Sequence, residues 1–285
     1  MEYIRLNNGI TMPKLGFGVF QINDFEECER SVLDALEVGY RSIDTAQYYQ
    51  NEEAVGSALD KSDVPRREIF LTTKIWPTNF GEQKTEDAVY GSLKRLGTDY
   101  LDLVLLHQPF GDYYGAWRAL EKLHRQGVIR AIGVSNFYPG RYLDFVNFVD
   151  TVPAVNQVES HVFHQQDELA DTMSHYGTAF EAWGPLAQGK HDFFTHPALA
   201  EIGGKYGKSN SQVGLRFLLQ LDRIVIPKTT HRDRMIENFD VFDFTLSDED
   251  MNTLKALETG QPNTWPHWDR RRVNQILQMK NADWK

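Results

Sequence analysis

Three stretches of the chain end short apolar runs on side chains that can handle protons. Arg41-Ser-Ile-Asp44 ends on a carboxylate, Ile69-Phe-Leu-Thr-Thr-Lys74 on an ammonium and Leu103-Val-Leu-Leu-His107 on an imidazole. A phenol, Tyr49, follows Asp44 by five residues in a polar loop. If the three runs are neighbouring strands, about 4.8 Å apart, their long side chains can converge. We therefore interpret these residues as one proton-handling site, which makes an enzyme the leading hypothesis.

The phenol is the group in this site that depends most on its neighbours. A free tyrosine has a pKa of about 10 and is a poor acid–base group at neutral pH. The Lys74 ammonium is expected to lower that pKa, while Asp44 keeps Lys74 protonated. His107 is expected to donate a hydrogen bond to a substrate oxygen or to orient Tyr49. Such a set suits protonation of a carbonyl oxygen, and the adjacent Tyr48 is the alternative phenol.

Alternating strand and helix patterns are predicted to position these residues. After an N-terminal hairpin (3–6 and 10–13), the strands are expected near 15–18, 40–44, 69–74, 101–107, 129–135, 154–159, 178–183 and 223–227. Helical patterns lie between them, for example at 26–38, 84–96, 114–126, 167–176 and 211–220. This order predicts an α/β protein with a parallel sheet.

The regular alternation, without a change in composition, indicates one (β/α)8 TIM barrel domain over residues 1–285, with a C-terminal extension. A doubly wound open sheet is disfavoured because no Gly-x-Gly-x-x-Gly motif follows a strand. In a barrel, chemistry is located on the loops after the strands. Asp44, Lys74 and His107 fall there, and so do polar residues near the ends of later strands.

Composition excludes several other classes of protein. The formal charge of −10 argues against general nucleic-acid binding, and no apolar run approaches the ~18 residues that span a membrane. No signal peptide is visible, so a cytoplasmic location is expected. The single cysteine, Cys28, excludes an intramolecular disulfide and is expected to be a half-buried spectator. His161-Val-Phe-His164 lacks the His-Glu-x-x-His pattern, so no metal is expected.

Several motifs resemble the aldo-keto reductase family, in the same order and over nearly the whole chain. They are Gly16-Phe-Gly18-Val-Phe20, Asp44-Thr-Ala-Gln-Tyr-Tyr49-Gln-Asn51-Glu52, Leu96-Gly-Thr-Asp-Tyr-Leu-Asp-Leu103, Gly133-Val-Ser-Asn-Phe137, Asn156-Gln-Val-Glu159 and Ile226-Pro-Lys228. The segment 181–189 further resembles the family's bacterial 2,5-diketo-D-gluconate reductase branch. The resemblance implies that Asp44, Tyr49, Lys74 and His107 are a catalytic tetrad, with Tyr49 as general acid. It also implies a monomer that reduces a small-molecule carbonyl substrate.

The resemblance further implies a nicotinamide cofactor held by loops at the barrel mouth. Ser135, Asn136 and Gln157 match positions that bind the nicotinamide carboxamide. Trp183 is expected to stack on the nicotinamide ring, although many family members have tyrosine there. The residues that follow it, expected to contact the cofactor, are Gly184, Pro185, Leu186 and Gln188. The loop 188–197 is expected to cover the pyrophosphate as a lid.

Basic residues after the last strand point to the phosphorylated form of this cofactor. Lys228 and Arg234 flank the start of a helical pattern, where backbone N–H groups and the helix dipole also favour anions. In the family these positions and that of Thr229 surround the 2′-phosphate, and the matches of Glu237 and Asn238 lie near the adenine. We therefore expect a preference for NADPH (NADP+) over NADH.

Aromatic residues on the strand-end loops are expected to form the substrate pocket. Phe20, Trp76 and Phe110 are predicted to line it with His107, and Tyr48 is a further candidate. The aromatic segment Asn263-Thr-Trp-Pro-His-Trp268 is expected to close on the pocket or to pack on the barrel exterior. Two alternatives remain, a non-catalytic nucleotide-sensing barrel and a sugar isomerase on the same fold.

Overall fold

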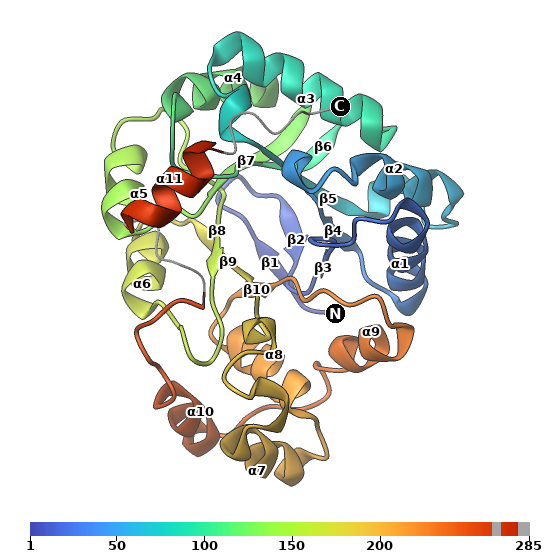
Figure 1. Ribbon diagram of the computed structural model, residues 1–285, viewed down its shortest axis with the longest axis vertical. Helices are drawn as coiled ribbons and strands as arrows, with labels where there is room; N and C mark the ends of the chain where they lie inside the picture. The colour runs from blue at the N-terminus through green and yellow to red at the C-terminus, as the bar shows by residue number, and fades with distance from the viewer. Residues whose placement is uncertain (264–268, 279–285) are drawn as a thin grey trace.

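Eight parallel strands form the centre of the molecule in a computed structural model that describes residues 1–263 and 269–278 (Figure 1). Their order in the sheet is their order in the chain. They are β3 (Phe17–Gly18), β4 (Ser42–Asp44), β5 (Phe70–Ile75), β6 (Leu101–Leu106), β7 (Ile129–Ser135), β8 (Val155–Glu159), β9 (Ala179–Trp183) and β10 (Ile224–Val225). Backbone hydrogen bonds from Gly16 N to Val225 O (2.9 Å) and from Val225 N to Lys14 O (2.8 Å) join the two edges. The predicted (β/α)8 barrel is confirmed.

Helices follow the strands and surround the barrel (Figure 1). They are α1 (Phe25–Val38), α2 (Glu52–Lys61), α3 (Glu82–Leu96), α4 (Tyr113–Arg125), α5 (Pro139–Val146), α6 (Asp167–His175), α7 (Pro197–Tyr206), α8 (Asn210–Gln220), α9 (Arg232–Phe239), α10 (Asp248–Lys255) and α11 (Arg270–Gln278). Local signals fix several ends: Asp24 caps α1 by accepting a hydrogen bond from Glu27 N (2.8 Å), and Ser209 forms a capping box with Gln212. No helix in the described part of the chain is long and apolar enough to cross a membrane.

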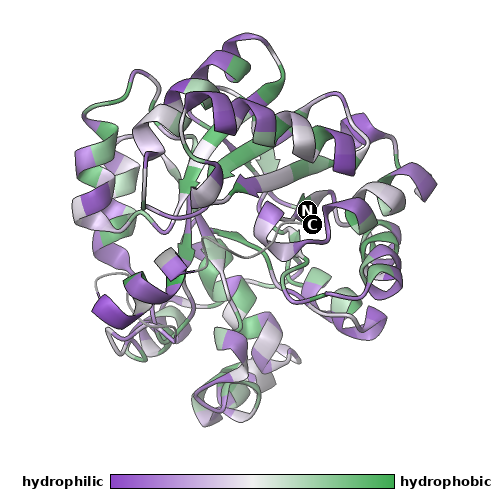
Figure 2. Cartoon of the chain, turned by 45° about the horizontal axis from the view of Figure 1, so that its top comes forward, coloured by the Kyte–Doolittle hydropathy of each residue, from purple (hydrophilic) through white to green (hydrophobic). Residues whose placement is uncertain are grey.

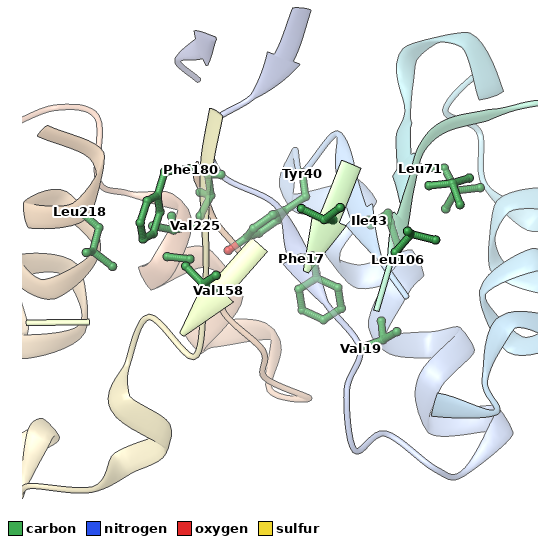
Figure 3. Close-up of a cluster of buried hydrophobic side chains, with 14 of the residues drawn as sticks. Phe17, Val19, Tyr40, Ile43, Leu71, Leu106, Val158, Phe180, Leu218 and Val225 are labelled. Atoms are coloured by element: carbon green, nitrogen blue, oxygen red, sulfur yellow. The ribbon is translucent and has the colours of Figure 1, made fainter. Parts of the chain in front are cut away.

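The main hydrophobic core lies between the strands and the helices around them. Figure 3 shows Ile43, Val158 and Val225 from the strands among the buried apolar side chains, with Leu218 from α8. In Figure 2 the central strands are mostly green and the surrounding helices carry purple on much of their length. Because both faces of these strands are buried, they occur in the sequence as nearly continuous apolar runs.

The inside of the barrel is apolar at its lower end, where the strands begin. It is polar at its upper end, where the strands finish. The predicted hairpin is present as β1 (Tyr3–Arg5) and β2 (Thr11–Pro13). Its Leu6 and Met12 pack with Leu103 and Val155 at the lower end of the barrel. Gly133 permits close approach here, since a Cβ on it would lie 2.5 Å from the Val155 carbonyl oxygen. Polar chemistry is thereby confined to the end where the strands finish.

Cys28 lies on the buried face of α1 and is fully buried, not half-buried as the sequence suggested. Burial raises the pKa of its thiol to about 12, with a smaller contribution from Glu27. A thiol of this kind is unreactive at neutral pH.

Candidate active site

The structure brings Asp44, Lys74 and Tyr49 together at the upper end of the barrel. Lys74 is fully buried at the end of β5, and its ammonium donates to Asp44 Oδ1 (2.5 Å) at the end of β4. The same nitrogen donates to Thr45 O (3.0 Å) and to the Tyr49 hydroxyl (3.2 Å). An ammonium has three protons, and here each has an acceptor. Lys74 is therefore held in one orientation, with the phenol oxygen as one of its partners.

The loop after β4 positions Tyr49 through the two residues that complete its motif. Tyr49 lies in a short 3-10 turn, Gln47–Tyr49. The Asn51 amide donates to Val19 O (2.9 Å) and Ile22 O (3.2 Å) and accepts from the Thr45 hydroxyl (2.8 Å). Buried Glu52 accepts from Thr73 Oγ1 (2.6 Å). These bonds tie the loop to β3 and β5, which explains why the motif extends past the phenol.

The two adjacent tyrosines have different surroundings, and these show which hydroxyl contacts Lys74. Tyr48 stacks on Trp76, with ring centroids 4.2 Å apart and an interplanar angle of 20°. Tyr49 lies beside Phe20, centroid to centroid 4.9 Å, and carries the hydroxyl that Lys74 contacts. The spacing argument that selected Tyr49 agrees with this geometry.

Burial changes one expectation about the phenol. The Lys74 ammonium does lower the pKa of Tyr49, but desolvation raises it more, and Asp44 and Glu181 raise it further. The net pKa is raised, so the expectation of a lowered pKa is wrong. For Lys74, burial lowers the pKa, while Asp44 and Tyr49 together raise it above its usual value. At neutral pH the pair is thus a protonated phenol and a charged ammonium.

His107 follows β6 and faces the phenol. Its ring centroid lies 5.7 Å from that of Tyr49 and 5.1 Å from that of Trp76, both in edge-to-face arrangements. The Asn136 side chain donates to the His107 carbonyl oxygen (3.0 Å), which fixes the backbone at this point. All four members of the predicted tetrad therefore meet at three successive strand ends, as the sequence indicated.

A cleft of about 500 Å³ opens above these residues. Its lining includes predicted residues from both halves of the site, namely Phe20, Asp44, Tyr49, Trp76, His107, Ser135, Asn136, Gln157, Trp183, Gly184, Pro185, Leu186, Gln188 and Lys228. Tyr48 lines it too. Phe110 is half-buried and is not part of this lining in the described structure, whereas Gln108 is. The turn of the chain after His107 determines which of these two side chains lines the cleft. The sequence pattern at the strand end does not indicate that turn.

Other lining residues were not named as site residues in the sequence. Gly189 and Phe194 belong to the predicted loop 188–197, and Ile226 and Pro227 belong to the motif that ends at Lys228, whereas Gln21, Gln108 and Ile276 had no signal. Ile276 is informative because it belongs to α11, so this helix contributes to the wall of the cleft. Figure 1 shows α11 near the ends of β8 and β9. Trp265, His267 and Trp268 lie outside the described residues.

On the cofactor side, a chain of hydrogen bonds orients Trp183. Its indole nitrogen donates to Asn136 Oδ1 (3.1 Å), and the Asn136 amide nitrogen donates to His107 O and to Ser135 Oγ (3.1 Å). The Ser135 hydroxyl donates to the Gln157 carbonyl oxygen (2.9 Å). Asn136 thus uses both ends of its amide within the protein. Its geometry orients the Trp183 ring at the cleft wall.

After β10, three nearby basic residues differ in their ion pairing. Arg232 is paired with Asp34 (2.9 Å) and Glu37 (2.8 Å) on α1. Lys228 and Arg234 are exposed and form no ion pair within residues 1–263 and 269–278. The first turn of α9 also lacks a side-chain cap. Unpaired cations beside an open helix N-terminus suit a phosphate group.

The remaining predicted cofactor residues lie around this helix. Thr229 is buried, and its hydroxyl accepts from His231 N (3.2 Å). Glu237 accepts from the Ser209 hydroxyl (2.5 Å), and Asn238 is buried on the same helix. These residues border the basic pair, although only Lys228 also lines the cleft.

The predicted lid loop 188–197 and the residue just before it are hydrogen-bonded to Asn263. Asn263 accepts from Lys190 Nζ (2.7 Å) through its carbonyl oxygen and donates to Ala187 O (2.7 Å) through its side chain. Asn263 N also donates to Glu159 Oε1 at the end of β8 (2.6 Å). The loop is therefore tied to the start of the C-terminal extension.

No group of three or more His, Cys, Asp or Glu residues in the described ranges is arranged to hold a metal ion. His161 and His164 are buried and pack against each other, with ring centroids 6.1 Å apart. Burial lowers the pKa of His161, which keeps it neutral at physiological pH.

The fold and the site together define a barrel oxidoreductase that acts on carbonyl groups. Residues 14–259 match the aldo/keto reductase family, and the chain belongs to this family. It is 46% identical to a glyoxal reductase of Bacillus subtilis over 257 residues, covering 90% of this chain and 92% of that protein. It is 39% identical to the methylglyoxal reductase DkgA of Escherichia coli over 261 residues, covering 90% and 94%.

Solved structures give the same result. An aldo-keto reductase from a deep-sea metagenome library of the Medee basin has a TM-score of 0.90 at 40% identity, covering 93% of this chain and 98% of that one. A Bombyx mori aldo-keto reductase solved with NADP has a TM-score of 0.87 at 31% identity, covering 93% and 95%. The family resemblance in the sequence is confirmed, and the protein is an NADPH-dependent reductase of carbonyl compounds.

Proposed function

We propose that this reductase acts on small, uncharged aldehydes and ketones such as methylglyoxal and glyoxal, with Tyr49 as the proton donor. The observation that carries the assignment is the contact between the Tyr49 hydroxyl and Lys74 at the base of an aromatic-lined cleft. The phenol oxygen accepts a hydrogen bond from Lys74, so the phenolic proton remains available to point into the cleft. This is the arrangement that general acid catalysis needs.

Bound NADPH supplies the hydride that reduces the carbonyl carbon. As the C=O π electrons move to oxygen, Tyr49 transfers its phenolic proton to that oxygen, and the product is an alcohol. The negative charge left on the phenolate lies 3.2 Å from the Lys74 ammonium, which stabilises it. Asp44 keeps Lys74 charged, and the His107 ring beside the phenol orients the carbonyl oxygen. A proton from solvent then restores the phenol.

Several chain residues suit the NADPH that this chemistry needs. Gln157 and Trp183 line the cleft beside the phenol, where the nicotinamide would bind. Lys228 and Arg234 would hold the 2′-phosphate at the start of α9, with Thr229, Glu237 and Asn238 around the adenosine. This assignment is supported by the lack of competing ion pairs on both cations within the described residues.

The lining of the cleft supports the substrate class. Phe20, Tyr48 and Trp76 surround the phenol, and among the described lining residues Lys228 is the only lysine or arginine. Lys228 lies at the other end of the cleft, and the Lys74 ammonium is fully buried with acceptors for all three of its protons, so a carboxylate on the substrate would find no accessible lysine or arginine among the described lining residues near Tyr49. The names of two relatives, glyoxal reductase and methylglyoxal reductase, point to the same small carbonyls. A keto-sugar acid is the less favoured substrate.

The test is NADPH oxidation by purified protein with methylglyoxal, glyoxal and a keto-sugar acid. Tyr49→Phe is expected to lower kcat by about 10³-fold, within the usual range for loss of a general acid, while NADPH still quenches protein fluorescence. Tyr48→Phe is the matched control and should change kcat only a few-fold. Near-normal turnover by Tyr49→Phe would refute the assignment. Faster turnover of the keto-sugar acid than of methylglyoxal would refute the substrate class.

Monomeric state, a cytoplasmic location and the absence of nucleic-acid partners remain predictions, as does the extent of one domain over residues 1–285. Size-exclusion chromatography and cell fractionation would test the first two. The comparisons give no support to a nucleotide-sensing barrel or to a sugar isomerase.

A further inference from the structure

One buried carboxyl group below the cleft takes no part in the chemistry described so far. Glu181 lies on β9, two residues before Trp183, and is 1% exposed. Its Oε2 accepts a hydrogen bond from the Gln157 amide nitrogen (2.9 Å). The same nitrogen donates to Asp44 Oδ2 (2.8 Å). One amide group therefore bridges two carboxyl groups inside the barrel.

This bridge fixes which end of the Gln157 amide faces the cleft. The amide nitrogen has two protons, and Asp44 and Glu181 accept one each. A flipped amide would set its oxygen against the Asp44 carboxylate. The amide oxygen is thus the part of Gln157 left for a ligand, and Gln157 lines the cleft next to Trp183. A carboxamide that binds there would donate its N–H to this oxygen.

We propose that Glu181 is a positioning residue of the reductase site. Through the Gln157 amide it holds the Gln157 oxygen toward the nicotinamide and fixes the far side of Asp44. Asp44 in turn orients Lys74, whose ammonium contacts the phenol oxygen of Tyr49. The residue thereby links the cofactor side of the cleft to the proton-donating side. The inference rests on Tyr49 being the proton donor.

The charges around Glu181 add a pH dependence to this role. Its pKa is raised to about 8: burial and the nearby Asp44 carboxylate raise it, and Gln157 and Lys74 offset part of that rise. The other carboxyl oxygen, Oε1, is buried and has no hydrogen-bond partner among the described residues, so no donor there stabilises the ionised form. Ionisation of Glu181 raises the pKa of Tyr49, so the phenol becomes a weaker acid above about pH 8.

Two substitutions separate the hydrogen bond from the charge. Glu181→Gln keeps an oxygen that accepts from Gln157 but cannot ionise, whereas Glu181→Leu removes the acceptor at similar size. Ser42→Ala is the matched control, because Ser42 lies buried on β4 and its hydroxyl has no partner among the described residues. Circular dichroism and thermal unfolding identify any variant that fails to fold.

NADPH affinity is measured by quenching of protein fluorescence, and kcat for methylglyoxal is measured from pH 6 to 10. Glu181→Leu is expected to weaken NADPH binding about tenfold and to lower kcat, while Glu181→Gln binds NADPH within about twofold of the wild type. The wild type should lose activity through about pH 8, a loss that Glu181→Gln should not show. The control should match the wild type in both measurements.

Two results would overturn the proposal. One is wild-type NADPH affinity and an unchanged pH profile in Glu181→Leu. The other is equal loss of affinity in both Glu181 variants, which would show that the hydrogen-bond acceptor at this position does not hold the Gln157 amide. If the wild type reduces no carbonyl at all, the proposed substrate class and proton donor fail first. The binding measurement still tests the Gln157 bridge in that case, so the two failures remain distinct.

Discussion

The two ends of the cleft arrange their charges in opposite ways. Around Tyr49, every proton of Lys74 has an acceptor inside the protein, and Lys74 and Asp44 are nearly inaccessible to solvent. At the start of α9, Lys228 and Arg234 are exposed and have no ion-pair partner within the described ranges. The first end has all its partners within the protein, whereas the second, in the function we propose, receives the 2′-phosphate of the cofactor as its partner.

This contrast reflects what each end does. A proton donor must already be oriented and stabilised when the reaction begins, because electrostatic preorganisation acts only through groups that do not move at that moment. A binding site gains affinity by leaving its donors unsatisfied until the ligand comes. Arg232 lies within one helix turn of Arg234 but differs from it in pairing. Its ion pairs with Asp34 and Glu37 hold α9 against α1 and leave it less available to a ligand.

The largest expected effect comes from breaking the buried end. Lys74→Met removes the cation that stabilises the phenolate and should lower kcat by about 10²- to 10⁴-fold. NADPH binding should change little, because Lys74 does not line the cleft. Stopped-flow or steady-state reduction of methylglyoxal measures the first quantity and fluorescence quenching the second. A kcat within tenfold of the wild type would contradict the role given to Lys74.

A smaller effect is expected at the open end. Replacing both Lys228 and Arg234 with alanine should raise the KM for NADPH by about 100-fold, on the basis of roughly tenfold for each charge-assisted bond. The KM for NADH and the kcat should hardly change. Arg232→Ala is the control and should leave the KM for NADPH nearly unaltered. Equal changes for NADPH and NADH would remove the argument for a 2′-phosphate site.

The smallest effect needs no mutation. Exposed charges are screened as the Debye length falls from about 10 Å at 0.1 M salt to about 3 Å at 1 M, whereas buried pairs are screened much less. Added salt should therefore raise the KM for NADPH several-fold and leave kcat at saturating NADPH nearly constant. The double alanine variant should lose most of this salt dependence. A kcat that falls as steeply as affinity would contradict the comparison.

Local sequence patterns predicted most of the fold for clear physical reasons. The β7 strand was expected at 129–135 and lies at Ile129–Ser135, because a strand buried on both faces is a mostly apolar run, interrupted here only by the exposed Arg130. Helix ends at Gly39 and Gly97 follow from their positive φ angles of 120° and 63°. The position of α11 was harder to predict, since nothing in its sequence pattern indicates that Ile276 reaches the cleft.

The sequence by itself determined the four residues of the proposed tetrad, because strand ends in a barrel must share one face and their side chains are long enough to meet. It also determined the basic pair after the last strand. Only the tertiary structure decided the sign of the Tyr49 pKa shift, since desolvation depends on everything packed around the phenol and outweighs the nearby ammonium. Likewise, the bridge from Glu181 through Gln157 to Asp44 joins residues 113 and 24 positions apart, which only barrel closure brings together.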